Sequence, residues 1–160
     1  MDKSICKISE EFAYGLGLFY ADGSCGLKRN KYAGAFWRIV GWKKTCLEKA
    51  QLAFNKQWNN MDFYFKSFDS YKKGAPTNFG ARKKTLYCLE AGLRQRHNDG
   101  SRGRFIKQFR ELIYDELKQK RIPTIIFSGR VTYKKAFLQG VIDGDGTKLL
   151  DWSGFISCHG

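Results

Sequence analysis

Residues 15–23 read GLGLFYADG, and residues 138–146 read LQGVIDGDG. Each stretch is apolar, contains glycines, and ends with a small residue, an aspartate and a glycine. Such a run is too short to cross a membrane, which needs roughly 20 residues. Small residues allow two helix backbones to approach closely, and a glycine just past the last turn ends a helix. We therefore predict two helices that pack against each other through Gly15, Gly17 and Gly140.

The acidic residue at the end of each stretch is Asp22 in the first and Asp145 in the second. If the two helices pair, both carboxylates project from the same end of the pair. Two carboxylates held together are a common way to bind a divalent metal beside a phosphate. A carboxylate at a helix C-terminus also opposes the helix macrodipole, and a metal ion would remove that penalty. These two aspartates are therefore the candidate metal ligands.

The two stretches resemble the motif of the LAGLIDADG homing endonucleases. In the second stretch, the matching residues are Leu138, Gly140, Asp143, Asp145 and Gly146, with Gly144 as the small residue. In the first stretch, they are Gly17, Leu18, Ala21, Asp22 and Gly23. The first stretch departs from the motif at Tyr20, where the family often has an aspartate, and at Gly15, where it has leucine. The segment 120–135 also resembles the linker between the two repeats of this family.

The resemblance implies cleavage of both strands of a long duplex DNA target with Mg²⁺ as the cofactor. It makes Asp22 and Asp145 the catalytic metal ligands, and the backbone carbonyls of Ala21 and Gly144 further oxygen ligands. Hard oxygen ligands suit Mg²⁺ better than zinc. A basic group usually assists near the site, and the candidates are Lys83, Lys84, Arg94 and Arg96.

Between the motifs, helical and extended patterns alternate. A helical stripe of apolar residues runs from Ile8 to Phe19, and two extended pieces follow in residues 24–42, where Trp37 and Ile39 share one face and Arg38 the other. A capping-box pattern at 45–48 predicts the next helix, with Leu47, Ala50 and Phe54 buried. Strands are expected at 61–69 and 84–90, and an amphipathic helix should then bury Phe105, Phe109, Leu112, Ile113 and Leu117.

This αββαββα order predicts an α+β fold with an antiparallel sheet. The resemblance implies that the sheet forms a saddle, backed by helices, whose open face lies on DNA. We expect residues 1–120 to form the complete first repeat and residues 121–135 the linker. Residues 136–160 would then form an incomplete second repeat, with a motif helix and one strand. Its completion would need a second polypeptide or a second copy of the chain.

The net charge of +14 favours a polyanionic partner, with nucleic acid before an anionic membrane surface. The predicted contacts with duplex DNA are the cations and one tyrosine of the hairpin tip, strands and following loop: Lys28, Arg29, Lys31, Arg38, Tyr64, Lys66, Lys72 and Lys73. Such contacts make affinity fall steeply with salt. Trp37, Phe63 and Phe65 are expected in the core instead of stacking on bases.

The chain has five cysteines, without a C-x-x-C pair, and two histidines. This distribution predicts ordinary thiols of a reducing, intracellular compartment instead of a zinc site or a disulfide framework. Residues 1–10 lack the apolar region of a secretory signal, and no transmembrane run is present.

Three functions remain open from the sequence. The first is a homing endonuclease, carried by an intron or a free-standing gene in preference to an intein. The second is a non-cleaving nucleic-acid binder of the same fold, either an intron maturase or a DNA-binding regulator. The third is an inactive truncated remnant. The presence of both Asp22 and Asp145 favours the enzyme, whereas the short segment after Gly146 favours loss of cleavage.

Overall fold

The computed structural model of the chain describes residues 8–27, 35–69, 85–93 and 101–145. Its elements follow the order α1 (Glu10–Asp22), β1 (Gly23–Gly26), β2 (Phe36–Gly41), α2 (Lys44–Gln57), β3 (Met61–Asp69), β4 (Thr85–Leu93), α3 (Ser101–Ile113), α4 (Thr124–Phe127) and α5 (Val131–Asp145). The predicted α+β class is confirmed, and the elements from α1 to α3 follow the predicted αββαββα order. No helix in these ranges has the length and apolar character that crossing a bilayer requires.

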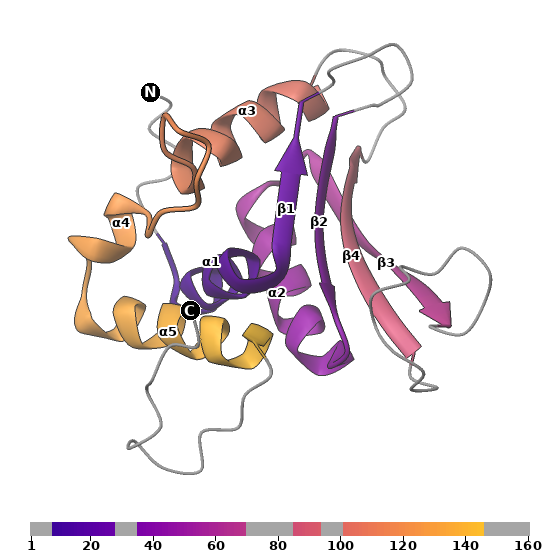
Figure 1. The fold of residues 1–160 in the computed structure, drawn as a ribbon, viewed down its shortest axis with the longest axis horizontal. Helices are drawn as coiled ribbons and strands as arrows, with labels where there is room; N and C mark the ends of the chain where they lie inside the picture. Colours follow the sequence, from indigo (N-terminus) through magenta and orange to yellow (C-terminus); the bar gives the residue numbers. More distant parts are fainter. Residues whose placement is uncertain (1–7, 28–34, 70–84, 94–100, 146–160) are drawn as a thin grey trace.

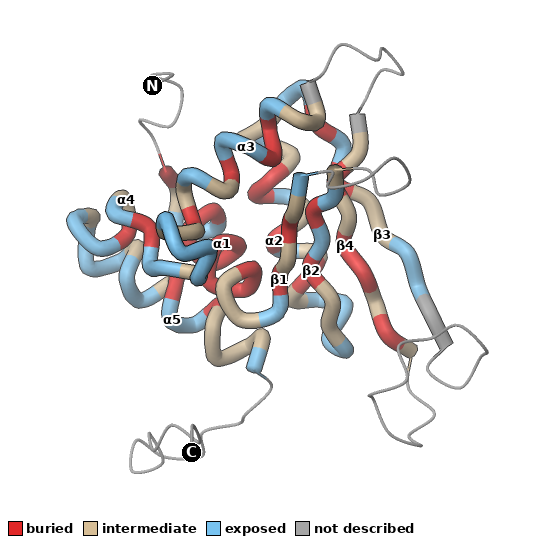
Figure 2. Tube along the Cα trace, turned by 45° about the horizontal axis from the view of Figure 1, so that its top comes forward, coloured by how far each residue is buried: buried red, intermediate tan, exposed pale blue. Residues whose placement is uncertain are grey.

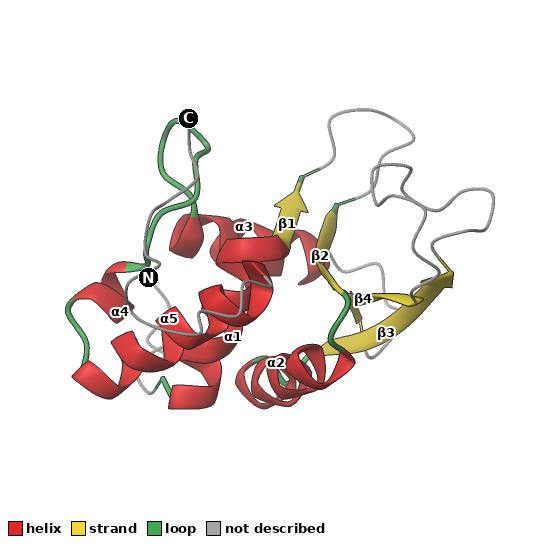
Figure 3. Ribbon diagram, turned by 60° about the horizontal axis from the view of Figure 1, so that its bottom comes forward, coloured by secondary structure: helices red, strands yellow, loops and turns green. Residues whose placement is uncertain are grey.

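The four strands form one antiparallel sheet in the order β1-β2-β4-β3 (Figure 1). The helices lie on one side of this sheet, as Figure 3 shows, and its other side carries no helix among the described residues. Along β2 the burial alternates as predicted, because Trp37 and Ile39 are buried whereas Phe36 and Arg38 are exposed. The architecture is therefore a two-layer saddle, and we call the side of the sheet without described helices its open face. Leu86 and Cys88 of β4 are buried on that side too.

The core between sheet and helices is built from aromatic rings. The Trp37 ring stacks on Phe19 of α1 at a centroid distance of 5.3 Å, and it meets Phe54 and Phe63 edge-on at 5.1 Å. Phe109 of α3 contacts the same indole at 5.5 Å. Offset and edge-to-face geometries of this kind are the favoured ones for aromatic pairs. Trp37 and Phe63 are thus core residues, as predicted, and Phe65 is partly buried.

Helix α1 runs through the middle of the molecule and is buried from Phe12 to Phe19 (Figure 2). Its start is defined by Ser9, whose Oγ accepts a hydrogen bond of 3.1 Å from the Phe12 amide. A side-chain oxygen at this position satisfies one of the free N–H groups of the first turn. Gly23 then ends the helix and passes the chain directly into β1.

Several predicted boundaries differ from the structure. The α2 helix begins at Lys44 after Lys43, which makes no capping hydrogen bond with its side chain, so the capping-box prediction at 45–48 is wrong. Its predicted buried residues Leu47, Ala50 and Phe54 are confirmed. Leu117 lies beyond the end of α3 and is 78% exposed, because α3 ends at Ile113 and the chain turns at 115–119.

The predicted linker 121–135 contains the short helix α4 and the first turn of α5, which begins at Val131. The predicted strand after the second motif falls in residues 146–160, outside the described ranges. Among the cysteines, Cys25, Cys46 and Cys88 carry free thiols.

Candidate functional site

The helices α1 and α5 pack side by side with their backbones in direct contact (Figures 1 and 3). A methyl group at Gly17 would overlap the carbonyl oxygen of Phe137, and one at Gly140 would overlap the carbonyl oxygen of Tyr14. Only glycine permits this approach on either helix. The structure therefore brings Gly17 and Gly140 together at the helix pair.

Gly15 lies on a different contact from the one expected. A methyl group there would meet the ring of Phe54 on α2 at 3.1 Å, so Gly15 faces α2 and not α5. The correction follows from helix geometry, because Gly15 and Gly17 lie about 200° apart around the α1 axis. The second glycine of α5 in this interface is instead Gly144, where a methyl group would lie 2.5 Å from the Cβ of Ala21.

A polar contact between the helices forms beside these glycines. The Tyr14 hydroxyl donates a 2.8 Å hydrogen bond to Oδ2 of Asp143, and Gln139 donates one of 3.0 Å to Oδ1. Burial, followed by hydrogen bonds with Cys46 and Asp143, raises the pKa of Tyr14. Tyr20, at the position where an aspartate was expected, packs edge-on against the Phe137 ring at 5.7 Å. Asp143 therefore has a bonding role between the helices, and Tyr20 has a packing role.

The helix pair brings its two terminal aspartates together at one end. A methyl group at Gly144 would lie 3.5 Å from a carboxylate oxygen of Asp22, and Asp145 follows directly along α5. Partial burial, reinforced by the negative charge of Asp145, raises the pKa of Asp22 to about 6, while Lys120 acts in the opposite direction. A carboxyl group whose pKa is raised by burial and by a neighbouring acid, as that of Asp22 is, is a common feature of cation-binding and catalytic sites.

Lys120 is a candidate site residue that the sequence analysis did not identify. Its ammonium group donates hydrogen bonds to the last carbonyls of α1, at 2.8 Å to Tyr20, 3.2 Å to Phe19 and 3.5 Å to Ala21. Burial lowers the pKa of Lys120, whereas the charges of Asp22, Cys25 and Asp145 act to raise it. A cation on the free carbonyls of a helix C-terminus also complements the macrodipole.

The turn at 115–119 explains how a residue so far along the chain reaches α1. The Asp115 amide bonds the Gln119 carbonyl at 2.8 Å, and an isolated bridge pairs Tyr114 with Lys120. Lys118 adopts a left-handed φ of 64° in this turn. The chain reverses its direction in this irregular turn. The helical and strand periodicity of the sequence therefore could not predict that Lys120 lies beside Asp22. The other basic candidates, Lys83, Lys84, Arg94 and Arg96, lie outside the described residues.

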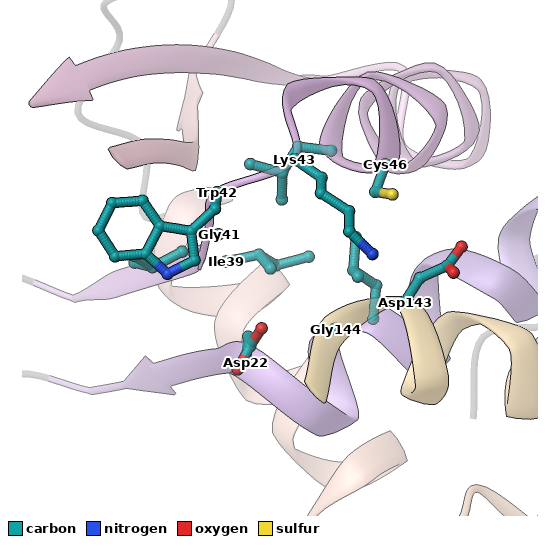
Figure 4. Close-up of a pocket in the computed structure, with 11 residues that line it drawn as sticks. Asp22, Ile39, Gly41, Trp42, Lys43, Cys46, Asp143 and Gly144 are labelled. Atoms are coloured by element: carbon teal, nitrogen blue, oxygen red, sulfur yellow. The ribbon is translucent and has the colours of Figure 1, made fainter. Parts of the chain in front are cut away.

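A shallow hollow opens next to the aspartates, between the end of the helix pair and the junction of β2 with α2. Its polar lining comes from Asp22, Asp143, Lys43 and Cys46, and Trp42 stands at its edge (Figure 4). Leu18, Ile39 and Leu47 form its apolar floor. The hollow thus places one basic side chain, Lys43, on the same recess as Asp22 and Asp143.

The donor set at the helix ends fits a hard divalent cation. Within the described ranges, no cluster of three or more histidine, cysteine or acidic side chains exists, so a site made wholly of side chains is absent there. Asp22 and Asp145 supply two carboxylates, and the carbonyls of Ala21 and Gly144 lie at the same helix ends. Few protein ligands, all oxygen, with positions left for water are what Mg²⁺ prefers.

The predicted DNA contacts divide into two groups. Arg38, Tyr64 and Lys66 lie on the open face of the sheet, on neighbouring rungs of β2 and β3 around β4. Lys28, Arg29, Lys31, Lys72 and Lys73 lie outside the described residues.

Comparison with known proteins yields little beyond this geometry. No protein-family model matches the chain. A stretch of 143 residues, covering 89% of the chain, is 25% identical to part of a DNA polymerase from Acanthamoeba polyphaga mimivirus. The match spans 7% of that polymerase, so it concerns a small segment of a much longer protein. The chain is thus similar to part of one DNA-related protein.

Proposed function

We propose that the chain is a metal-dependent endonuclease of the LAGLIDADG type, which hydrolyses phosphodiester bonds at a specific site in duplex DNA. The observation that carries this proposal is the pair Asp22 and Asp145 at the end of two helices packed through glycines. The charge of +14 and the open strand face with Arg38 and Lys66 support a polyanionic substrate. The similarity to a segment of a viral DNA polymerase is in keeping with action on DNA.

In this proposal, Asp22 and Asp145 hold Mg²⁺ together with the carbonyls of Ala21 and Gly144. When bound, Mg²⁺ supplies a Lewis acid that polarises a phosphate and lowers the pKa of a bound water. The chain's own residues position the substrate around that centre. The glycine contacts hold the two carboxylates at a fixed separation, and the strand face holds the duplex so that the scissile phosphates lie at the helix ends.

Two basic side chains, Lys120 and Lys43, lie beside the proposed metal centre in the described part of the chain. Lys120 lies beside both aspartates, and Lys43 lines the adjacent hollow. Hydrolysis adds a water oxygen to phosphorus and breaks the bond to one ester oxygen, which then takes up a proton. A nearby ammonium group stabilises the negative charge that develops on that oxygen. Lys120 is the better placed of the two, because its ammonium group already lies at the C-terminus of α1.

A cleavage assay tests this function directly. Long duplex targets from a random library are incubated with the chain in Mg²⁺ and, separately, in Ca²⁺, and cut products are sequenced. We expect Asp22→Asn and Asp145→Asn each to abolish cutting while binding persists. Glu111→Gln is the matched control, since Glu111 is an exposed acid on α3 and does not belong to the α1–α5 helix pair. Cutting by both aspartate variants at the wild-type rate would contradict the metal-site assignment.

A second candidate, a DNA binder of the same fold that does not cut, is favoured by the outer side of α5. The motif alignment equates Gly15 with Leu138 and Phe19 with Ile142. Gly15 and Phe19 are both buried, whereas Leu138 is 50% exposed and Ile142 is half-buried. Val131 and Phe127 are exposed on the neighbouring surface. In the described part of the chain, α5 thus lacks the sheet that covers α1, and a second polypeptide or a second copy would complete it. Sequence-specific binding without cutting, in Mg²⁺ and with both aspartates intact, would favour this candidate.

A further inference from the structure

A row of polar side chains crosses all four strands on the open face of the sheet. The register pairs Ser24 with Arg38, Arg38 with Glu90, and Glu90 with Tyr64. Hydrogen bonds join the row at both ends, since the Arg38 Nε donates to the Ser24 hydroxyl at 3.3 Å and the Tyr64 hydroxyl donates to Glu90 at 3.1 Å. These four residues, which we name the cross-strand row, present ordered polar groups on the side away from the core.

Glu90 is the unexpected member of the cross-strand row. It lies on β4 with Arg38 on one side and Lys66 close to the other, in a chain with a net charge of +14. If this surface bound only the phosphates of DNA, a neutral or basic residue in place of Glu90 would give higher affinity, because a carboxylate repels the DNA backbone. An acid at the centre of this face therefore has a role other than backbone affinity.

Among the described residues, the carboxylate of Glu90 is held mainly through one of its two oxygens. Oε2 accepts hydrogen bonds from Lys66 at 2.7 Å and from Tyr64 at 3.1 Å. The Cys88 thiol approaches Oε1 at 3.9 Å, and thiols are weak donors. Partial burial acts to raise the pKa of Glu90, but the bonds from Lys66 and Tyr64 outweigh it, so the pKa is lowered and the group is ionised at neutral pH. Glu90 is thus an oriented, ionised acceptor whose Oε1 has only a weak donor, Cys88, among the described residues.

Resting on the proposed function, we infer that Glu90 determines sequence specificity by accepting a hydrogen bond from a base amino group in the major groove. A carboxylate has acceptors only, so it pairs with the N4 amino group of cytosine or the N6 amino group of adenine. It disfavours guanine and thymine, which present keto oxygens at the equivalent position in the major groove, because the carboxylate oxygen and the keto oxygen are both acceptors. Lys66 and Tyr64 act as positioning residues that hold the carboxylate in place.

A binding selection tests this assignment. The full chain selects from randomised duplexes in Ca²⁺, and the enriched sites are compared with those chosen by Glu90→Gln. At one base position we expect the wild type to favour an amino-bearing base by roughly 5- to 150-fold. The amide of Glu90→Gln presents both a donor and an acceptor, so the preference for amino over keto bases should fall to about threefold or less. Whether cytosine or adenine is enriched identifies the base.

Two further variants separate recognition from charge and from folding. Glu111→Gln removes the same charge from α3, and it should leave the selected site unchanged. Glu90→Asp keeps an acceptor-only group on a shorter side chain, so a weaker amino preference should survive. Suppose that the wild type selects a site, and that Glu90→Gln has a wild-type melting curve and selects the same site. The inference about Glu90 then fails, while the proposed function is unaffected. If the wild type selects no site at all, the proposed function fails with it. Should Glu90→Gln not fold, Glu90→Asp decides alone. A weakened amino preference in a Glu90→Asp variant that melts like the wild type supports the inference, and an unchanged preference overturns it.

Discussion

The Tyr14 hydroxyl on α1 donates a 2.8 Å hydrogen bond to the Asp143 carboxylate on α5, two residues before the terminal acid Asp145. Tyr14 is buried at 8% exposure, and Asp143 receives a second bond from Gln139. The bond ties the two motif helices at a defined axial and rotational position. Asp22 and Asp145 are the last residues of those helices. The contact therefore also helps to fix the relative position of the two carboxylates.

Replacing Tyr14 with phenylalanine should therefore remove the hydrogen bond between the helices while it keeps the packed ring. Loss of one hydrogen bond to a charged acceptor costs about 1–3 kcal/mol of unfolding free energy, measured by urea denaturation. Tyr133→Phe is the matched control on α5, since the hydrogen bonds described between the helices do not involve Tyr133, and it should change stability by less than about 0.5 kcal/mol. Equal effects of the two variants would show that the Tyr14 bond contributes nothing specific.

Alanine at Gly17 should be far more damaging than alanine at another helical glycine. The added methyl would overlap the Phe137 carbonyl, and separating two helix backbones costs about 1–3 kcal/mol or more. Gly103 on α3 is a suitable control, because a methyl there meets nothing within 4 Å. Gly103→Ala should instead stabilise the protein by about 0.5–1 kcal/mol through helix propensity. Thermal and urea unfolding of both variants give the comparison, and a mild effect at Gly17 would contradict the close backbone contact.

The raised pKa of Asp22 predicts a pH dependence of stability in metal-free buffer. The group has a pKa of about 6 when folded against an ordinary value of 3.8, so the folded state favours the protonated acid. Its contribution is complete below about pH 4 and is lost as the pH rises through 6. The stability of wild type relative to Asp22→Asn should therefore fall between pH 4 and 6 in the presence of a chelator.

A carbon NMR titration of the Asp22 carboxyl measures the same pKa directly. Asp145→Asn should lower it only in part, because burial is the larger cause and the charge of Asp145 the smaller. Divalent metal should displace the titration to lower pH, since metal binds the ionised form. A titration near the ordinary value of 3.8 in metal-free wild type would mean that the Asp22 carboxyl is well solvated and lies too far from Asp145 to be affected by its charge.

Lys120→Met should affect both stability and the acid pair. The variant removes the cation from the carbonyls of Phe19, Tyr20 and Ala21, which we expect to cost about 1 kcal/mol. The pKa of Asp22 should rise further, because Lys120 opposes the rise in the wild type. If Lys120 also assists hydrolysis, cleavage should fall well beyond what the lost stability explains. Lys107→Met, at an exposed position on α3, is the control and should leave all three readouts unchanged.

Much of the fold could be predicted, because patterns of neighbouring residues indicate the helices and strands. Alternation along 36–41 identified Trp37 and Ile39 as core residues, and the helical stripe ending at Asp22 identified α1. The terminal glycines and aspartates of the two motifs indicated paired helix ends. These features depend on periodicity, residue size and end chemistry, each of which is a property of consecutive residues.

The remaining features depend on contacts between distant segments. Gly15 and Gly17 look equivalent in sequence, but the rotation of α1 against α2 and α5 decides which neighbour each one meets. Lys120 reaches Asp22 through an irregular turn with a left-handed residue, and Glu90 meets Arg38 and Tyr64 only because β4 inserts between β2 and β3. The sequence by itself determined the elements and the two terminal acids. Only the tertiary structure decided which cations, hydroxyls and glycines surround them, because strand order, register and helix rotation are properties of the packed whole.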